Sequence, residues 1–145
     1  MKIEVILLDN QVKKFKGDVI KKVLRLSRFL KNKGLIEAYL INSRRMQDLN
    51  KRFRGKNKST NVLSFAAPKN FPGNKLGEVY LDPLYIEKHG EDLDLMLVHG
   101  VLHILGYDHE KKGDRIKMER REAMLLSKIR STKLEILNNN EITMF

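Results

Sequence analysis

Three of the four histidines in this 145-residue sequence lie in one short stretch, from His99 to His109. His99 and His103 are four positions apart, so on an α-helix they share one face and both imidazoles can reach one point. Gly106 can end this helix, because glycine adopts the left-handed conformation of a C-terminal cap, and the chain can then return to His109. Imidazole is a favoured ligand of zinc and related metals, and three protein ligands leave an open position for water. The stretch therefore predicts a metal site made of His99, His103 and His109.

The spacing His-x3-His-x2-Gly-x2-His matches the zinc-ligand frame of the metzincin peptidases, with one difference. Those enzymes carry a glutamate directly after the first histidine as general base, whereas this chain has Gly100. A glycine inside a helix costs about 1 kcal/mol relative to alanine, which indicates that another part of the protein approaches the backbone closely there. The pattern predicts a metal centre without the peptidase base.

Other interpretations of these histidines fit less well. A single histidine on an apolar helix is usually a core residue, but three at ligand spacing with a glycine at the reversal favour a metal. A structural zinc usually has four protein ligands, and the chain has no cysteine to complete such a set. His89 lies at a polar helix end and is left out of the site. We expect one Zn²⁺ per chain, although three imidazoles would also accept Ni²⁺ or another transition metal.

Length and composition indicate one compact domain over residues 1–145, with residues 131–145 as a flexible tail. The lack of cysteine is compatible with a reducing cytoplasm. The apolar run from Ile3 to Leu8 is too short for a secretory signal or a membrane span. We therefore expect a cytoplasmic protein that does not enter a membrane, while its oligomeric state stays open.

The net charge of +11 is unevenly distributed. Residues 1–60 hold 17 Lys and Arg against 5 Asp and Glu, whereas residues 61–145 hold 12 against 13. Such asymmetry favours a polyanionic partner, and nucleic acid is the first candidate because phosphate neutralisation releases counterions. Lysine-rich helices with solvated charges are the alternative, and composition alone does not separate the two.

Hydrophobic periodicity predicts four short strands and five helices. The strands are expected at 2–8, 35–41, 62–66 and 76–81. The helices are expected from a cap at Asp18 to about Asn32, from a cap at Ser43 to near Gly55, from a cap at Asp82 to about Lys88, around the histidines, and from Gly113 to about Arg130. The histidine helix is apolar almost all round, which is typical of a buried helix. This order predicts an α/β fold of the α+β-like kind, in which helices cover a small central mixed sheet of about four strands.

The polar and basic stretch from Arg54 to Asn61 lies between the second predicted helix and the third predicted strand. It is a candidate for phosphate contact. The alternative is a solvated connection, and the two interpretations are equally compatible with the residues.

Three stretches together resemble the bacterial YbeY family, namely residues 54–65 (RGKNKSTNVLSF), 76–78 (LGE) and 99–109 (HGVLHILGYDH). The resemblance extends over nearly the whole chain in order and length, but no motif covers the residues after Arg130. Two positions depart from the usual pattern, with Ser59 where many members have proline and Ile104 where leucine is usual. Neither position is a proposed metal ligand.

Members of this family are endoribonucleases of ribosomal RNA maturation. The resemblance implies a single-strand-specific, metal-dependent endoribonuclease with a zinc-type ion on the three histidines and a central mixed sheet. It also implies a role in processing ribosomal RNA ends, including the 3′ end of 16S rRNA, and in ribosome quality control, with ribosomal RNA and ribosomal particles as partners. Arg54 is indicated as a catalytic or RNA-binding residue.

The lack of a glutamate directly after His99 to act as general base affects the expected mechanism. A single metal can polarise a phosphoryl oxygen, or lower the pKa of its bound water to about 7, so a separate glutamate is less essential for phosphodiester cleavage. The guanidinium of Arg54 matches phosphoryl oxygens with paired hydrogen bonds. Asp108, beside the third histidine, is a candidate for orienting the ligand or accepting a proton, and equally for forming a turn.

Two other functions share parts of this pattern. One is a metal-stabilised RNA-binding factor of ribosome assembly with little catalytic activity. The other is a peptidase or small-molecule hydrolase built on the metzincin-like frame, which Gly100 and the basic first part of the chain disfavour.

Overall fold

The computed structural model describes residues 1–131, so the predicted tail over 131–145 lies outside the described residues except for its first position. Within the described part the strands are β1 (Lys2–Leu7), β2 (Leu35–Leu40), β3 (Val62–Ala66) and β4 (Lys75–Leu81). They form one sheet in the order β1-β2-β4-β3. β1 and β4 run parallel to β2, whereas β3 at the edge runs antiparallel to β4. The predicted mixed sheet is confirmed.

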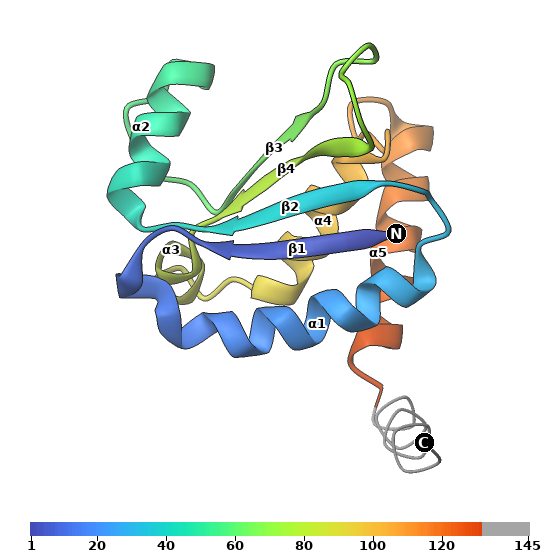
Figure 1. The fold of residues 1–145 in the computed structure, drawn as a ribbon, viewed down its shortest axis with the longest axis horizontal. Helices are drawn as coiled ribbons and strands as arrows, with labels where there is room; N and C mark the ends of the chain where they lie inside the picture. Colours follow the sequence, from blue (N-terminus) through green and yellow to red (C-terminus); the bar gives the residue numbers. More distant parts are fainter. Residues whose placement is uncertain (132–145) are drawn as a thin grey trace.

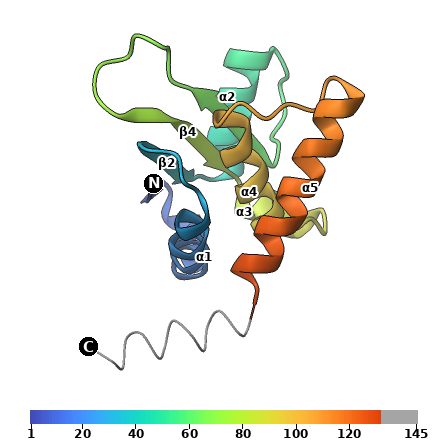
Figure 2. The ribbon, with the colours of Figure 1, turned by 90° about the vertical axis from the view of Figure 1, so that its right-hand side faces the viewer.

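The helices lie unequally on the two faces of this sheet (Figure 1). They are α1 (Lys16–Phe29), α2 (Ser43–Arg54), α3 (Pro83–Lys88), α4 (Leu93–Ile104) and α5 (Lys112–Ile129). α1, α4 and α5 lie on one side, and α4 is placed between the sheet and α5 (Figure 2). On the other side, α2 covers only one end of the strands (Figure 1). Among the described residues, no helix combines the length and apolar character needed to cross a membrane.

The core forms between the sheet and the helix carrying the histidines. Strand residues on the inner face alternate with half-buried outer ones, as in the burial of Ile36, Ala38 and Leu40 along β2. On α4, Val98 and Val101 are fully buried against this face. Burying each such side chain contributes roughly 1.5–3 kcal/mol, so α4 is held firmly against the sheet. This confirms the expected buried position of the histidine helix.

Two predicted helix starts were wrong. α1 begins at Lys16 because a 3₁₀ turn over Asn10–Phe15 leads directly into it, so Asp18 lies inside the first turn. An acid there still interacts favourably with the helix dipole. α1 also ends at Phe29 rather than near Asn32.

The cap of α2 is Asn42 rather than Ser43. Its side-chain oxygen accepts a hydrogen bond from the backbone N–H of Arg45, at 2.8 Å. Asp9, which follows β1, accepts bonds from the Asn42 backbone at 3.0 Å and from the Arg45 guanidinium at 2.9 Å. The Arg45 hydrogen bond is the main reason why the pKa of Asp9 lies below its ordinary value. These contacts fasten the start of α2 to the end of β1.

Candidate metal centre

The three histidines of the predicted site converge. One ring nitrogen from each of His99, His103 and His109 lies within 4.8 Å of the others. The Nε2 atoms of His99 and His103 are 3.0 Å apart, as one helical turn allows. Two Zn–N bonds of about 2.0–2.1 Å at a tetrahedral angle place their nitrogens about 3.3 Å apart, so the donors are arranged for such an ion after small adjustments.

The chain returns to the site where the glycine allows it. α4 ends at Ile104, and Gly106 follows with φ of 98°, in the left-handed region that favours glycine. The backbone N–H groups of Gly106 and Tyr107 bond back to carbonyls of the last helical turn. This reversal brings the exposed His109 beside the two helical histidines, as predicted.

A carboxylate on α5 orients the first histidine. Glu122 is 9% exposed, and its Oε2 lies 3.2 Å from Nδ1 of His99. In the tautomer that carries its proton on Nδ1, the Nδ1–H group donates a hydrogen bond to this carboxylate. The Nε2 atom then keeps its lone pair, which faces His103. Partners of this kind usually fix the ring and raise its basicity when a histidine binds a metal.

Burial and the neighbouring rings favour the neutral form of His103. Desolvation lowers the pKa of His103 below its usual value, and the nearby His99 and His109 lower it further. A neutral imidazole is the form that binds a metal. The donor set is therefore compatible with a late transition metal in chemistry as well as in placement.

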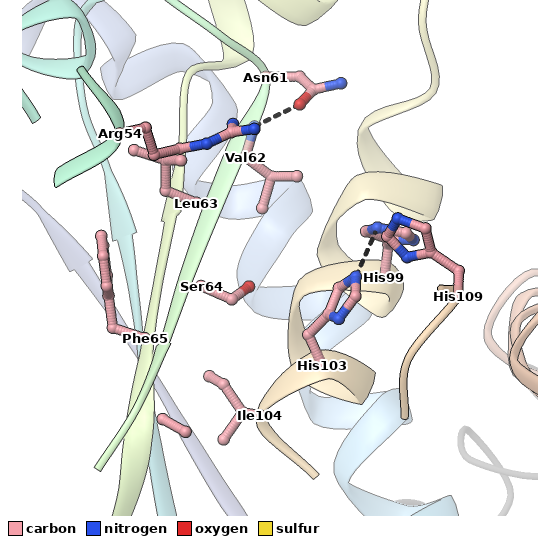
Figure 3. Close-up of a pocket in the computed structure, with 11 residues that line it drawn as sticks. Arg54, Asn61, Val62, Leu63, Ser64, Phe65, His99, His103, Ile104 and His109 are labelled. Atoms are coloured by element: carbon pink, nitrogen blue, oxygen red, sulfur yellow. Dashed lines mark hydrogen bonds between the residues drawn. The ribbon is translucent and has the colours of Figure 1, made fainter. Parts of the chain in front are cut away.

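The histidines line one side of a cleft of about 530 Å³ between α4 and β3. Arg54, at the end of α2, and Asn61, at the start of β3, lie across from them (Figure 3). The side chain of Ser64 points from β3 toward the histidines, and that of Phe65 points to the opposite side of the strand (Figure 3). The tertiary structure thus places an exposed guanidinium in the cleft that holds three metal-ligand candidates.

Buried contacts hold the basic loop that contributes this side of the cleft. Asn50 is buried and donates from its side chain to the Lys58 carbonyl at 2.8 Å. Ser59 donates to the buried carboxylate of Asp82 at 2.7 Å, which also caps α3. Gly55 adopts φ of 69° where α2 ends, so the loop turns back along the helix. The loop is therefore fastened at several points, and its residues 54–58 are exposed to solvent.

Gly100 faces the sheet rather than the cleft. A Cβ atom at this position would lie 2.7 Å from Val79 Cγ1 and 3.0 Å from both Ser64 Oγ and Val62 Cγ2. The Ser64 hydroxyl also donates to the Gly100 carbonyl at 3.0 Å. The close approach expected from a glycine inside this helix is confirmed, and it brings α4 directly onto β3 and β4.

Asp108 has a local role in the structure. Its Oδ1 accepts hydrogen bonds from the backbone N–H groups of His109 at 2.6 Å and Glu110 at 3.3 Å. The side chain is exposed and does not line the histidine cleft. It shapes the turn that presents His109, and a direct part in catalysis stays a prediction.

Glu122 was missed in the sequence. A signal was present, because it shares the helical stripe of Met118, Leu125 and Ile129, which are all buried. A carboxylate on an otherwise apolar stripe needs a partner, and here the partner is His99. What the sequence could not show is which side chain on another helix this carboxylate would meet.

Comparison with known proteins identifies the class to which this fold and cleft belong. The family model described as Endoribonuclease YbeY matches residues 2–130, and the chain belongs to the YbeY family. An Endoribonuclease YbeY of Aquifex aeolicus is 35% identical over 86% of this chain and 91% of its own. Another, of Anaplasma marginale, is 43% identical over 62% of this chain, and the match spans 64% of that relative, slightly under two thirds.

The fold also has a counterpart among solved structures. A solution structure of a protein from Thermotoga maritima is similar with a TM-score of 0.60, and the match covers 88% of each chain. The two sequences are 22% identical. This likeness supports the fold alone.

Proposed function

We propose that this protein is a metal-dependent endoribonuclease that cleaves single-stranded ribosomal RNA. The observation that carries the proposal is the cleft in which three histidine nitrogens face Arg54. Related chains are named endoribonucleases, which supports RNA as the substrate. The excess of positive charge in residues 1–60 supports a polyanionic substrate as well.

The metal would be held by His99, His103 and His109, with zinc as the first candidate. When bound, such an ion supplies Lewis-acid polarisation and lowers the pKa of water. Glu122 keeps the His99 ring turned so that its Nε2 faces the ion position. Nickel or another transition metal would suit the same three imidazoles.

Arg54 would act on the phosphate. Its guanidinium is exposed in the cleft and can donate paired hydrogen bonds to phosphoryl oxygens whose charge grows during displacement. We assign Asp108 to holding the turn before His109, because its carboxylate is engaged by backbone N–H groups there. In this position Asp108 would support the third ligand, and its predicted part as a proton acceptor stays untested by these contacts.

The packing of Gly100 counts against the peptidase alternative. A glutamate at position 100 would be directed against Val79, Ser64 and Val62, because the Cα–Cβ direction there points into the sheet. The position that supplies the general base in the metzincin frame therefore has no room for a glutamate side chain in this packing.

The test compares His103→Ala with a matched control, His89→Ala. His89 stacks on Tyr85 at 3.8 Å between ring centroids, and it does not line the histidine cleft. Protein purified without chelator or nickel resin is analysed for metal and then assayed on a single-stranded ribosomal RNA fragment. Wild type and His89→Ala should hold about one metal ion per chain and cut the RNA. His103→Ala should remain folded but lose both.

The same assay distinguishes the nuclease proposal from the alternative of an RNA-binding assembly factor. If fully metallated wild type cuts no faster than folded His103→Ala, the protein is a metal-stabilised RNA-binding factor and the nuclease proposal is wrong. Processing of ribosomal RNA ends, including the 3′ end of 16S rRNA, and ribosome quality control in the cytoplasm form the biological part of the proposal. They are tested by whether precursor ribosomal RNA accumulates in cells that carry only the His103→Ala protein.

A further inference from the structure

The face of the sheet opposite α4 carries a row of aromatic rings beside α2. The ring centroids of Phe53 and Phe65 are 5.0 Å apart, and those of Phe65 and Tyr80 are 5.8 Å apart. Tyr80 in turn stacks on Tyr39 at 4.7 Å. We call these four residues the aromatic row. Of the helices in the described part of the chain, only α2 lies on this side of the strands (Figure 1). No member of the row is fully buried.

Phe53 is the most exposed member of the row. It is 57% exposed and lies in the last turn of α2. Phe65, against which it tilts by 58°, is half-buried and supports it from β3. More than half of Phe53 is therefore open to solvent, while Phe65 supports its ring from the side of the sheet.

This aromatic surface is continuous with the histidine cleft. Phe65 lines the cleft as well as contacting Phe53, and Arg54 follows Phe53 directly in the chain. β3 is the edge strand, so a ligand can pass over it from the histidines to the aromatic row without meeting another strand. Figure 3 shows Phe65 directed away from His103 on the far side of β3.

Charge selects a polyanion for the Phe53 end of the row. Arg52 places its guanidinium 5.7 Å from the Phe53 ring centroid, and Lys51 and Arg54 belong to the same exposed helical turn. In the part of the chain that the structure describes, no carboxylate pairs with Arg52 or Arg54. A protein partner with an apolar surface would gain nothing from this group of cations, whereas a nucleic acid would.

The opposite end of the row is unsuited to phosphate. Glu37 and Glu78 lie there, joined by Lys75, whose ammonium is 2.6 Å and 2.7 Å from their carboxylates. Tyr39 and Tyr80 donate their hydroxyl groups to the same two carboxylates. These hydrogen bonds occupy the phenols and leave net negative charge, so a nucleic-acid strand is confined to Phe53 and Phe65.

We propose that Phe53, supported by Phe65, is a stacking subsite for an unpaired base of the RNA strand whose phosphate lies in the histidine cleft. The inference rests on the proposed function, because it takes RNA as the ligand. An aromatic side chain beside arginines binds bases through their π-faces and tolerates any sequence. A base within a duplex is already stacked and cannot reach the ring, so the subsite selects single strands.

The chain contains no tryptophan, so Phe53→Trp introduces a single fluorescent reporter at the subsite. A short unstructured oligoribonucleotide is titrated into the metallated full-length variant, and the RNA is checked on a gel for integrity. RNA binding should quench the tryptophan emission, and the RNA concentration at half-maximal quenching should equal the midpoint of binding measured by the anisotropy of labelled RNA. A duplex of the same length should leave the emission unchanged.

Affinity gives a second readout. Phe53→Ala should weaken single-strand binding by about five- to a hundredfold, and Phe53→Trp should bind as wild type does. The control is Phe71→Ala, because Phe71 is 46% exposed in the connection between β3 and β4 and does not line the cleft. It should leave the affinity unchanged. Thermal unfolding verifies that each variant is folded.

Unchanged RNA affinity in Phe53→Ala, together with unquenched tryptophan emission in Phe53→Trp, would overturn the inference. If the unchanged affinity came with loss of a protein contact or of self-association, the surface would belong to a protein partner instead. Neither readout requires cleavage, so the subsite is judged even if the protein cuts no RNA. Conversely, cleavage of RNA together with both of those negative results would refute the subsite and leave the nuclease proposal standing.

Discussion

Replacing Gly100 by alanine should loosen the contact between α4 and the sheet and thereby disturb the candidate metal centre. The added Cβ would meet side chains from both β3 and β4, the nearest being Val79 Cγ1 at 2.7 Å. Carbon atoms pack best at about 3.5–4.0 Å, so relief of this contact needs a displacement of about 1 Å. Val79 is fully buried, and the two other contacts come from different residues, so no single side-chain rotation relieves all three.

The magnitude follows from two opposing effects. Alanine favours a helix over glycine by about 1 kcal/mol, whereas an extra methyl group in a packed core typically costs about 1–3 kcal/mol. With three short contacts, the upper part of that range applies. The net loss in the free energy of unfolding should be about 1–2 kcal/mol, which corresponds to a fall in Tm of roughly 3–8 °C for a domain of this size.

The displacement should also reach the ligands. His99 and His103 lie on either side of Gly100 in α4, so an outward movement of the helix carries both rings away from their present positions. Functional sites tolerate deviations of only about 0.5 Å, so the affinity for Zn²⁺ should fall by about tenfold or more.

The assay measures chemical unfolding of metal-free protein and competitive Zn²⁺ binding to each variant. The matched control is Gly113→Ala in α5, because a Cβ there would meet no atom within 4 Å. That variant should unfold with equal or higher free energy, by up to about 1 kcal/mol, and should bind Zn²⁺ normally. If Gly100→Ala matches wild type in both measurements, the packing argument for this glycine is refuted.

Four further outcomes are expected. Arg54→Ala should lower single-turnover cleavage at saturating RNA by roughly 10²-fold or more with metal content intact, and a wild-type rate there would remove Arg54 from catalysis. Glu122→Ala should weaken Zn²⁺ binding by about 10–100-fold in competition titrations, and equal affinity would show that the bond to His99 does not orient the ring. RNA affinity measured by anisotropy should fall with salt by a logarithmic slope of about −0.7 per phosphate contact, whereas a flat response would mean that the basic residues are only solvated. Because the pKa of Asp9 is lowered in the folded state, its contribution to stability is present above the unfolded pKa of about 3.9 and is lost as pH falls through the folded value. Asp9→Asn should therefore unfold with a weaker pH dependence in that acidic range, and identical pH profiles would contradict the role of the Arg45 contact.

Local chemistry was sufficient for much of the backbone and for the convergence of the three histidines. His99 and His103 share a face because the helical period requires it, and Gly106 reverses the chain because only glycine adopts that φ without strain. The cap at Asp82 likewise depends on a neighbouring N–H group, that of Tyr85. These features could be predicted because each depends on residues only a few positions apart.

The starts of α1 and α2 were misplaced, because both depend on how the chain enters the helix. A 3₁₀ turn precedes α1, and Asn42 rather than Ser43 caps α2.

Contacts between distant segments were decided only by the tertiary structure. The gap of 45 positions between Arg54 and His99 carries no information about distance, and only the packing of α4 on β3 brings both into one cleft. Glu122 meets His99 because α5 packs on α4, and Phe53 meets Phe65 because α2 lies over one end of the sheet. At Gly100, one property could be predicted from the sequence and another depended on the tertiary structure. Its presence in a helix indicated a close approach, but only the order and register of the strands determined that Val79, Ser64 and Val62 would be the neighbours, because strand pairing depends on the whole chain.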